Sequence, residues 1–182
     1  MTKLGLSIEV ITGAELRAEH ATLMYRYYRS TIEKMGGIAY LTRRFFELLV
    51  ERMPEHVVFV LASQRDGSPV AGALNLMKGR SLYGRYWGCE DEFKHLHFEV
   101  CYYSAIEWGL ARGLDLFEAG AQGEHKFNRG FTPHLTLSAH EFRDIQLASA
   151  VREFIERERN AIGDVFQDYK DHDPFKRSET TK

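Results

Sequence analysis

The chain has 182 residues, of which 44% are hydrophobic and 27% charged, and its formal net charge is -2. This length is enough for one globular domain with a sizeable core. A charge so close to zero excludes a global field that would recruit nucleic acid or an anionic membrane, and leaves room only for a local basic patch. No run approaches the roughly 20 apolar residues of a membrane span, and the N-terminus lacks the apolar core of a signal peptide. Two cysteines are too few for a disulfide framework, so we expect a reduced cytoplasmic protein.

The first half of the chain predicts a strand, two helices and an antiparallel meander. Apolar residues at helical spacing, ended by Gly36 and Gly37, predict a helix over 13–34. Thr42 is a suitable N-cap for a second helix, 43–52, which Pro54 closes. Runs rich in β-branched residues, with a hairpin signal at Asp66-Gly67, predict the strands 5–11, 57–64, 70–79 and 81–89.

The second half returns to alternating helices and strands. We expect a helix over 97–113, strands over 114–120 and 134–140, and a long amphipathic helix over 142–162. Residues 1–170 then form a single domain, and residues 171–182 read as a disordered tail. The order β-α-α-β-β-β-α-β-loop-β-α predicts an α/β fold, a mixed sheet with helices on both faces.

The segment GAQGEHKFNRGF, residues 120–131, is the first candidate for a binding site. It follows the strand after the crossover helix, where open α/β sheets bind ligands. Glycines free backbone N–H groups to face an anion, and Lys126 and Arg129 add positive charge. The alternative is a self-contained loop in which Glu124 pairs with one of these bases. The candidate substrate-binding residues here are Gly120, Gln122, Gly123, Glu124, His125, Lys126 and Arg129.

The helix start LHFEVCYY supplies candidates for acid–base chemistry. Glu99 is either an acid in the first helical turn or a general base whose pKa its aromatic neighbours raise. His97 is either a capping residue or a catalytic partner, and at a spacing of two residues only one of the pair points into a site. Arg85, in the aromatic strand LYGRYWG, is either stacked on its neighbours or a substrate anchor.

Metal and hydrolase chemistry find weaker support. Five of the eight histidines lie in the stretch from His95 to His140. A metal site of histidine and carboxylate ligands could in principle use His125 and His140 with Glu99. HExxH and CxxC motifs are absent, so we expect no metal. Cys101 lies on the predicted buried helix face, which argues against a Cys–His hydrolase, and GxSxG, Walker A and GxGxxG motifs are also absent.

The segments LYGRYWGC, LHFEVCYY, GAQGEHKFNRGF and LTLSAH, with YRSTIEKMGGIAYLTRRFFELL and PVAGALNL upstream, resemble the FemAB-like family of predicted N-acyltransferases. The family carries the label peptidoglycan biosynthesis/recognition, and it is related to the GNAT superfamily and to the Fem-type aminoacyl-tRNA-dependent ligases. The resemblance covers about residues 8–160. It implies a GNAT-type fold and amide formation, in which an amine attacks an activated acyl group through a tetrahedral oxyanion.

Such a reaction needs a base, oxyanion donors and a proton for the leaving group. We assign these roles as hypotheses. Glu99 or His97 is the base, and Tyr102 or Tyr103 returns the proton. Backbone amides of 120–123, with Lys126 or Arg129, hold the oxyanion or a donor phosphate. The acceptor is a small-molecule or peptide amine, and the donor is an acyl-CoA, an acyl-carrier protein or an aminoacyl-tRNA, with no other nucleic acid and no membrane as partner.

The sequence departs from the family pattern in two places. The glycine-rich acetyl-CoA loop of GNAT enzymes is replaced by the acidic GCEDEFKHLH, which puts acetyl-CoA as donor in doubt. Family members usually have two GNAT-like halves, and this chain resembles the C-terminal half, so two copies in a homodimer are one way to complete a cleft. Two other functions stay open: a non-catalytic module that recognises a cell-wall peptide or amine, and a metal hydrolase.

Overall fold

The computed structural model describes residues 5–91, 93–120 and 124–171. It forms two units, Met1–Ala121 and Gln122–Lys182, and each is described by itself. The single domain expected over residues 1–170 therefore stays a prediction. Of the tail expected over 171–182, Asp171 instead ends α5, and the rest lies outside the described residues, as do the loop residues Gln122 and Gly123.

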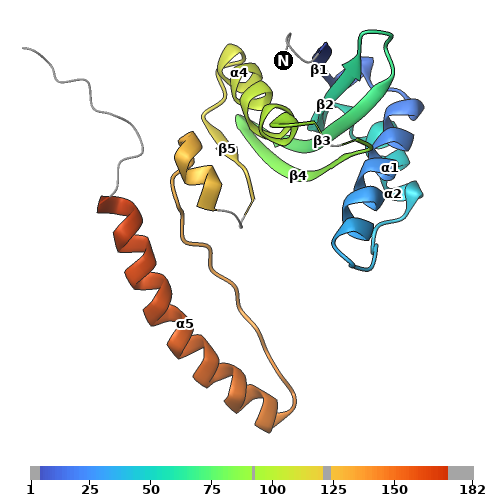
Figure 1. The fold of residues 1–182 in the computed structure, drawn as a ribbon. Coiled ribbons are helices and arrows are strands. Elements are labelled where there is room, and N and C mark those ends of the chain that lie inside the picture. Colours follow the sequence, from blue (N-terminus) through green and yellow to red (C-terminus); the bar gives the residue numbers. More distant parts are fainter. Residues whose placement is uncertain (1–4, 92, 121–123, 172–182) are drawn as a thin grey trace, which may run out of the picture. The chain divides into compact units, whose positions relative to one another are not determined.

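The first unit is built on one five-stranded sheet in the order β1-β2-β3-β4-β5 (Figure 1). Neighbouring strands are antiparallel except β4 and β5, which are parallel, so the predicted mixed sheet is confirmed. The strands are β1 (Leu6–Thr12), β2 (Val57–Gln64), β3 (Pro69–Lys78), β4 (Ser81–Cys89) and β5 (Leu116–Glu118). The predicted meander is correct to within a residue or so at its ends, whereas β5 has three residues in place of the seven expected over 114–120.

Helices cover both faces of this sheet, as the sequence predicts. The helix α1 (Ala18–Lys34) and the helix α2 (Arg43–Arg52) pack on one face, and the 3-10 turns η2 (Gly13–Glu15) and η3 (Pro54–His56) flank them. The other face carries one continuous helical run, made of α3 (Leu96–Phe98), the π-helical turn η4 (Glu99–Tyr103) and α4 (Ser104–Ala111). The helix predicted over 97–113 is therefore present, with a wider turn inside it.

The central strand β2 divides its side chains between two hydrophobic cores. Val58 and Val60 face α3, η4 and α4, where they pack with Leu82, Leu96 and Val100. Val57, Phe59 and Leu61 point the other way, into the core made with α1 and α2. Because side chains alternate across a strand, a continuous apolar run such as VVFVLA fits a strand that is buried on both faces.

The closest approach between α1 and the sheet occurs at two paired glycines. Gly72 of β3 lies opposite Gly88 of β4. A Cβ atom on Gly88 would lie 2.0 Å from the backbone oxygen of Tyr27, and a Cβ on Gly72 would lie 3.2 Å from the Tyr27 ring. The missing side chains leave the space that the Tyr27 ring occupies, and Tyr27 is fully buried there. The α1–sheet packing distance is therefore set by glycine.

The second unit contains the 3-10 turn η5 (Glu124–Arg129) and the long helix α5 (Ile145–Asp171). The strand predicted over 134–140 is wrong, because residues 131–142 have no regular secondary structure and Leu137 is 98% exposed. The alternating Leu135 and Leu137 fit a strand, but a strand also needs a hydrogen-bonded neighbour. Within this unit, residues 138–142 instead lie beside α5 and form a groove with Val151 and Ile155.

The long helix starts and ends later than its predicted bounds, 142–162. It starts at Ile145 because the Asp144 carboxylate accepts hydrogen bonds from the N–H groups of Gln146 and Leu147, at 2.8 and 2.9 Å. It continues to Asp171 because apolar residues recur at helical spacing beyond 162, among them Phe166 and Tyr169.

Gly88→Ala should destabilise the protein by about 3 kcal/mol or more, because the new Cβ collides with the α1 backbone rather than with a flexible side chain. Urea unfolding of the full chain would measure the change. Gly84→Ala is the matched control in the same strand, since a Cβ there meets its nearest atom at 3.5 Å, an ordinary contact. Equal stability of the two variants would contradict the glycine constraint.

The Tyr27 hydroxyl should make folding sensitive to alkaline pH. It has no hydrogen-bond partner among the described residues, and burial raises its pKa to about 12. A raised folded-state pKa gives stability that is complete below the ordinary tyrosine value of about 10 and is lost as the pH rises from about 10 to about 12. In that window the free energy of unfolding of Tyr27→Phe should fall less steeply than that of the unaltered protein. A fall of the same slope in both proteins would show that another group is responsible.

Candidate functional site

The strand β4 is irregular at the position where the sequence places a substrate anchor. Leu74 of β3 lies opposite Tyr86, whereas the next residue, Asn75, lies opposite Gly84. Arg85 is therefore the extra residue of a β-bulge, and its side chain is exposed. It makes no hydrogen bond or ion pair with another described residue. Bulges bend a strand and redirect a side chain, and they are frequent beside active sites.

A buried amide supports this bulge from β3. Asn75 is only 1% exposed, and its side-chain nitrogen donates a hydrogen bond to the backbone oxygen of Val58, at 3.3 Å. A Cβ on Gly84 would lie 3.6 Å from the Asn75 side-chain oxygen, so the amide lies directly against the bulged strand. Because a buried polar group is costly unless it is bonded, Asn75 holds a defined orientation here.

Beyond the bulge, β4 loses its neighbour on one side. Its pairing with β5 is limited to residues 81–83, and within the described residues no ladder continues along 84–89. Two hydroxyls of α1 bond backbone oxygens of this stretch: Thr31 donates to Trp87 at 2.7 Å and Ser30 donates to Cys89 at 2.9 Å. Along 84–89, where β5 no longer pairs with β4, the strand is therefore held by hydroxyls of α1.

Aromatic side chains join β4 to the start of the helical run. The His97 ring lies edge-on to Trp87, with centroids 4.8 Å apart, and edge-on to Tyr102, at 5.4 Å. The structure thus brings His97 together with the strand that carries Arg85, as the sequence predicts for these two segments. Tyr102 is 5% exposed, whereas Tyr103 points to the surface at 42% exposure.

The backbone around these residues is unusual in two ways. His95, just before α3, has φ of 68°, in the left-handed region that residues other than glycine rarely adopt. Glu99 is the first residue of the π-helical turn η4 and is half-buried. Its backbone N–H donates to the backbone oxygen of His95 at 3.3 Å, whereas its side chain has no hydrogen bond or ion pair with another described residue. Both π-helical turns and strained residues are over-represented at functional sites.

The predicted anion-binding loop is described only in part. Gly120 follows β5 with φ of 86°, Gln122 and Gly123 lie outside the described residues, and Glu124 begins η5. The Arg129 guanidinium donates a hydrogen bond to the backbone oxygen of His125, at 2.5 Å, so this base folds back onto its own turn. The alternative in which Glu124 pairs with one of the two bases stays a prediction. The juxtaposition of the loop with Glu99 stays a prediction.

Burial and charge act together on His125 in this turn. Desolvation lowers the pKa of its imidazole, and the positive charges of Arg129 and Lys126 lower it further. The neutral imidazole is therefore favoured near neutral pH. In the same unit the Phe127 ring packs against Tyr169 of α5, with centroids 4.8 Å apart, which anchors η5 to the helix.

Sequence reasoning missed a set of tyrosine hydroxyls next to the bulge. The hydroxyls of Tyr40 and Tyr86 lie 2.9 Å apart, and the Tyr28 hydroxyl accepts the N–H groups of Tyr40 and Leu41, at 3.0 and 3.2 Å. Burial, followed by the bond to Tyr40, raises the pKa of Tyr86. These bonds fix the loop between α1 and α2 against β4. Two glycines followed by apolar residues after position 35 were the signal available in the sequence.

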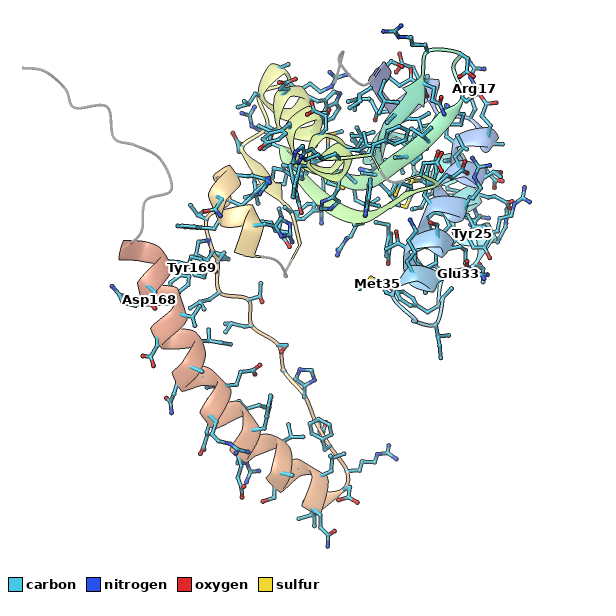
Figure 2. The ribbon with its side chains drawn as sticks, in the orientation of Figure 1. Arg17, Tyr25, Glu33, Met35, Asp168 and Tyr169 are labelled. Carbon is cyan, nitrogen blue, oxygen red and sulfur yellow. The ribbon has the colours of Figure 1, made fainter. Side chains whose placement is uncertain are left out.

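This loop also exposes large apolar side chains. Met35, at the end of α1 (Figure 2), is 77% exposed, and Ile38 and Tyr40 are 89% and 70% exposed. The loop reaches the strand β4 through the hydrogen bond between the Tyr40 and Tyr86 hydroxyls. Arg85 is the residue directly before Tyr86 in β4. The loop therefore adds exposed apolar side chains, and through Tyr40 a hydroxyl bonded to Tyr86, the neighbour of Arg85.

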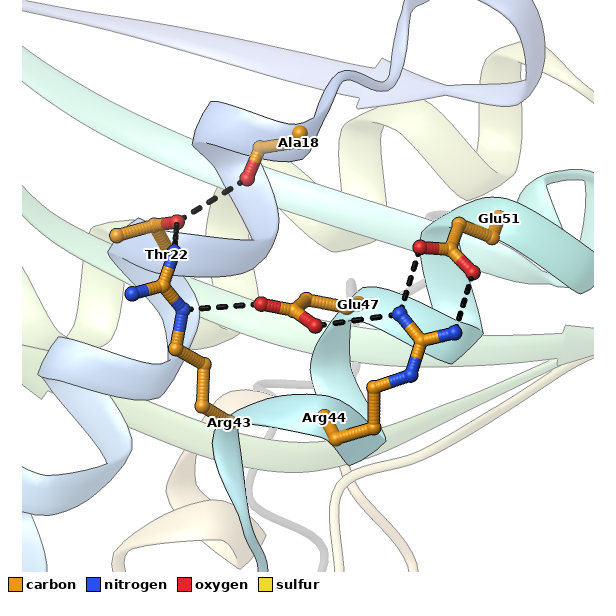
Figure 3. Close-up of polar contacts among 6 residues, drawn as sticks. All are labelled: Ala18, Thr22, Arg43, Arg44, Glu47 and Glu51. Carbon is orange, nitrogen blue, oxygen red and sulfur yellow. Dashed lines mark hydrogen bonds and ion pairs between the residues drawn. The ribbon is translucent and has the colours of Figure 1, made fainter.

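Two of the three arginines of α2, by contrast, are already paired with carboxylates. Arg43 pairs with Glu47 at 3.0 Å, and Arg44 reaches both Glu47 and Glu51, at 3.2 and 2.8 Å (Figure 3). These carboxylates raise the pKa of Arg44, and Arg44 lowers that of Glu51. Because Glu47 and Glu51 already balance the positive charges of Arg43 and Arg44, these two arginines are poor candidates for binding an anionic ligand.

The described residues contain neither a metal cluster nor a helix that could span a membrane. No group of three or more His, Cys, Asp or Glu side chains in this part of the chain is placed to hold a metal ion. The helices that the structure describes also include none with both the length and the apolar character needed to cross a bilayer.

Solved structures with a similar fold include aminoglycoside acetyltransferases. The aminoglycoside acetyltransferase meta-AAC0020, from an uncultured soil metagenomic sample, matches 80% of this chain and 99% of its own at 10% identity, with a TM-score of 0.52 in its complex with trehalose. Its complex with sisomicin matches the same shares at 11% identity, also with a TM-score of 0.52. At these identities the likeness shows the fold alone, which is the GNAT-like α/β fold that the sequence predicts.

L-PGS from Bacillus licheniformis matches 65% of this chain at 10% identity, with a TM-score of 0.48, and the chain spans only 37% of the length of L-PGS. No curated protein matches the chain. The model of the FemAB_like family, described as peptidoglycan biosynthesis/recognition, matches residues 1–177.

The His125 imidazole should titrate below the ordinary histidine pKa of about 6.5. A lowered folded-state pKa means that the unfolded chain binds the proton first, so acidification through about pH 6.5 should weaken the structure around η5. NMR titration of the histidine ring protons would give the midpoint. Lys126→Gln should raise it, because one of the positive charges is removed, whereas a midpoint at the ordinary value in the unaltered protein would contradict the burial of this ring.

Proposed function

Because the chain belongs to the FemAB-like family of peptidoglycan biosynthesis and recognition, we propose that it is an N-acyltransferase that joins an acyl or aminoacyl group to an amine. The observation that carries this proposal is the bulge of β4, where exposed Arg85 lies beside a strand edge that has no partner along 84–89 within the described residues. An extended substrate can lie along such an edge and bond the strand backbone. The GNAT-like fold supports the same class of reaction.

In the proposed reaction the acceptor amine attacks the acyl carbon of the donor. A carbon–nitrogen bond forms, the bond from the acyl carbon to the leaving group breaks, and the amine loses a proton. Glu99, half-buried at the π-helical turn, takes this proton directly or through His97. Tyr103 is the better proton donor to the leaving group, because it is 42% exposed whereas Tyr102 is buried.

Positive and backbone groups hold the negative charge that develops on the acyl oxygen. The oxyanion donors expected from the sequence, the backbone of 120–123 with Lys126, stay a prediction, and Arg129 holds its own turn through its bond to His125. Arg85 anchors an anionic part of the substrate. The tyrosine hydroxyls beside Arg85, with Met35 and Ile38, form the wall against which the acceptor lies.

The wider setting follows from the family description. We propose that the acceptor is a small or peptide amine related to peptidoglycan precursors, and that the protein acts in the cytoplasm. The donor is an acyl-CoA, an acyl-carrier protein or an aminoacyl-tRNA. Since family members usually contain two GNAT-like halves, we also propose that two copies of this chain pair as a homodimer to complete the cleft.

A non-catalytic module that binds a cell-wall peptide or amine is the second candidate. One observation favours it: the segment before the helical run is acidic, and its Asp91 is exposed. A phosphate group would be repelled there, so a phosphate-bearing donor needs another route to the site. This module would bind the acceptor and give no turnover.

Glu99→Gln should lower kcat/KM by about 10²–10⁴-fold, as expected for the loss of a general base, while the melting temperature stays unchanged. Donors would be chosen by thermal shift, since a ligand at 100 times its Kd adds about 2.7 kcal/mol of stability. Product formation with a peptidoglycan-derived amine would then be followed by mass spectrometry. The matched control is Glu107→Gln, an exposed acid of α4.

The outcomes separate the two candidates. Loss of turnover in Glu99→Gln but not in Glu107→Gln supports the acyltransferase and this site. Unchanged turnover in Glu99→Gln together with unchanged binding in Arg85→Ala would reject the site. Ligand binding with no product from any donor class would instead identify the binding module.

A further inference from the structure

The end of β4 is held by side chains from successive turns of α1. Ser30 donates to the backbone oxygen of Cys89 at 2.9 Å, and Arg26 pairs with Glu90 at 2.5 Å. One turn further along, the amine nitrogen of Lys34 lies 3.7 Å from the sulfur of Cys89. The contact between amine and thiol thus belongs to a fixed framework that keeps both groups in place.

The two groups of this contact differ in exposure. Cys89 is 8% exposed and is a free thiol, whereas Lys34 is exposed along its length at the end of α1. They are 55 positions apart in the sequence, so the contact exists only in the folded protein. A thiol that is oxidised to a sulfenic acid becomes an electrophile, and it condenses with a nearby thiol or nitrogen. Lys34 is such a nitrogen.

A second polar group lies near the same strand end. Tyr27 is fully buried, and its hydroxyl has no hydrogen-bond partner among the described residues. Arg26 lies over its ring at 5.7 Å, and Cys89 and Glu90 are close enough to raise the pKa of the hydroxyl. Tyr27 therefore adds a buried hydroxyl to the surroundings of Cys89, and Lys34 is the amine in contact with the Cys89 sulfur.

We propose that Cys89 and Lys34 become joined by a reversible sulfur–nitrogen bond when the protein meets hydrogen peroxide. In the first step the Cys89 sulfur attacks peroxide, the oxygen–oxygen bond breaks, and a sulfenic acid and water form. In the second step the neutral Lys34 amine attacks the sulfur. The sulfur–nitrogen bond forms, the sulfur–oxygen bond breaks, and the hydroxyl leaves as water with one amine proton.

The bond is reversed by thiols. A first thiol attacks the sulfur of Cys89, which releases the Lys34 amine and leaves a mixed disulfide, and a second thiol then frees Cys89. While it lasts, the bond ties α1 covalently to the end of β4, four residues after the bulged Arg85. It is a modification site of its own, and it stands whether or not the proposed transferase activity is correct.

Peptide mapping after mild peroxide treatment tests the proposal. Remaining thiols are alkylated and the protein is digested with trypsin. The bond prevents cleavage after Lys34, so peptide 30–43 should be found attached to peptide 86–94, which carries Cys89, at a mass two hydrogens below the sum of the two. Dithiothreitol should separate them. Cys101→Ser is the matched control, because the other thiol is removed and the linked peptide should persist.

Two variants make the result decisive. Lys34→Arg keeps the charge but has no primary amine, so the linked peptide should vanish while the melting temperature of the reduced protein is kept. Cys89→Ser should also abolish it. The proposal is overturned if peptide 86–94 gains oxygen while cleavage after Lys34 continues, or if Cys89 becomes linked equally well in Lys34→Arg.

Discussion

The approach of α1 to the sheet over Gly72 and Gly88 is the contact on which the rest of the first unit depends. Removing two side chains from one cross-strand pair lets the Tyr27 ring enter the sheet surface. That depth brings the α1 hydroxyls within reach of the backbone oxygens of Trp87 and Cys89. The unpartnered end of β4 is thereby kept extended and in register, and the bulge at Arg85 has a rigid strand on both sides.

The elements that could be predicted from the sequence are those whose signals are local. The β-branched run of β2, the Asp66-Gly67 turn and the cap position Thr42 each specify structure within a few residues, and those elements are confirmed. The strand expected over 134–140 fails for the opposite reason. The alternation of Leu135 and Leu137 is typical of a strand. A strand forms only beside a hydrogen-bonded neighbour, however, and the local sequence pattern carries no information about that neighbour.

The candidate site was predictable only in part for the same reason. Arg85, His97 and Glu99 can be singled out from the sequence because charged groups are unexpected in aromatic segments. In the structure the His97 ring contacts Trp87, a residue of the strand that carries Arg85. The bulge itself depends on the register of β4 against β3, and the hydroxyl pair of Tyr40 and Tyr86 joins residues 46 positions apart. Neither feature follows from a local pattern, and both decide what the exposed edge can bind.

The edge-on contact of Trp87 with His97 also gives the protein its own optical signal. The emission of an indole depends on the groups that touch its ring. The chain has two tryptophans, and the second, Trp108, lies under the Arg112 guanidinium at 4.4 Å, away from the His97 ring. A change in Trp87 emission on adding a ligand therefore reports on the contact between Trp87 and His97, so the state of the site can be followed without any label.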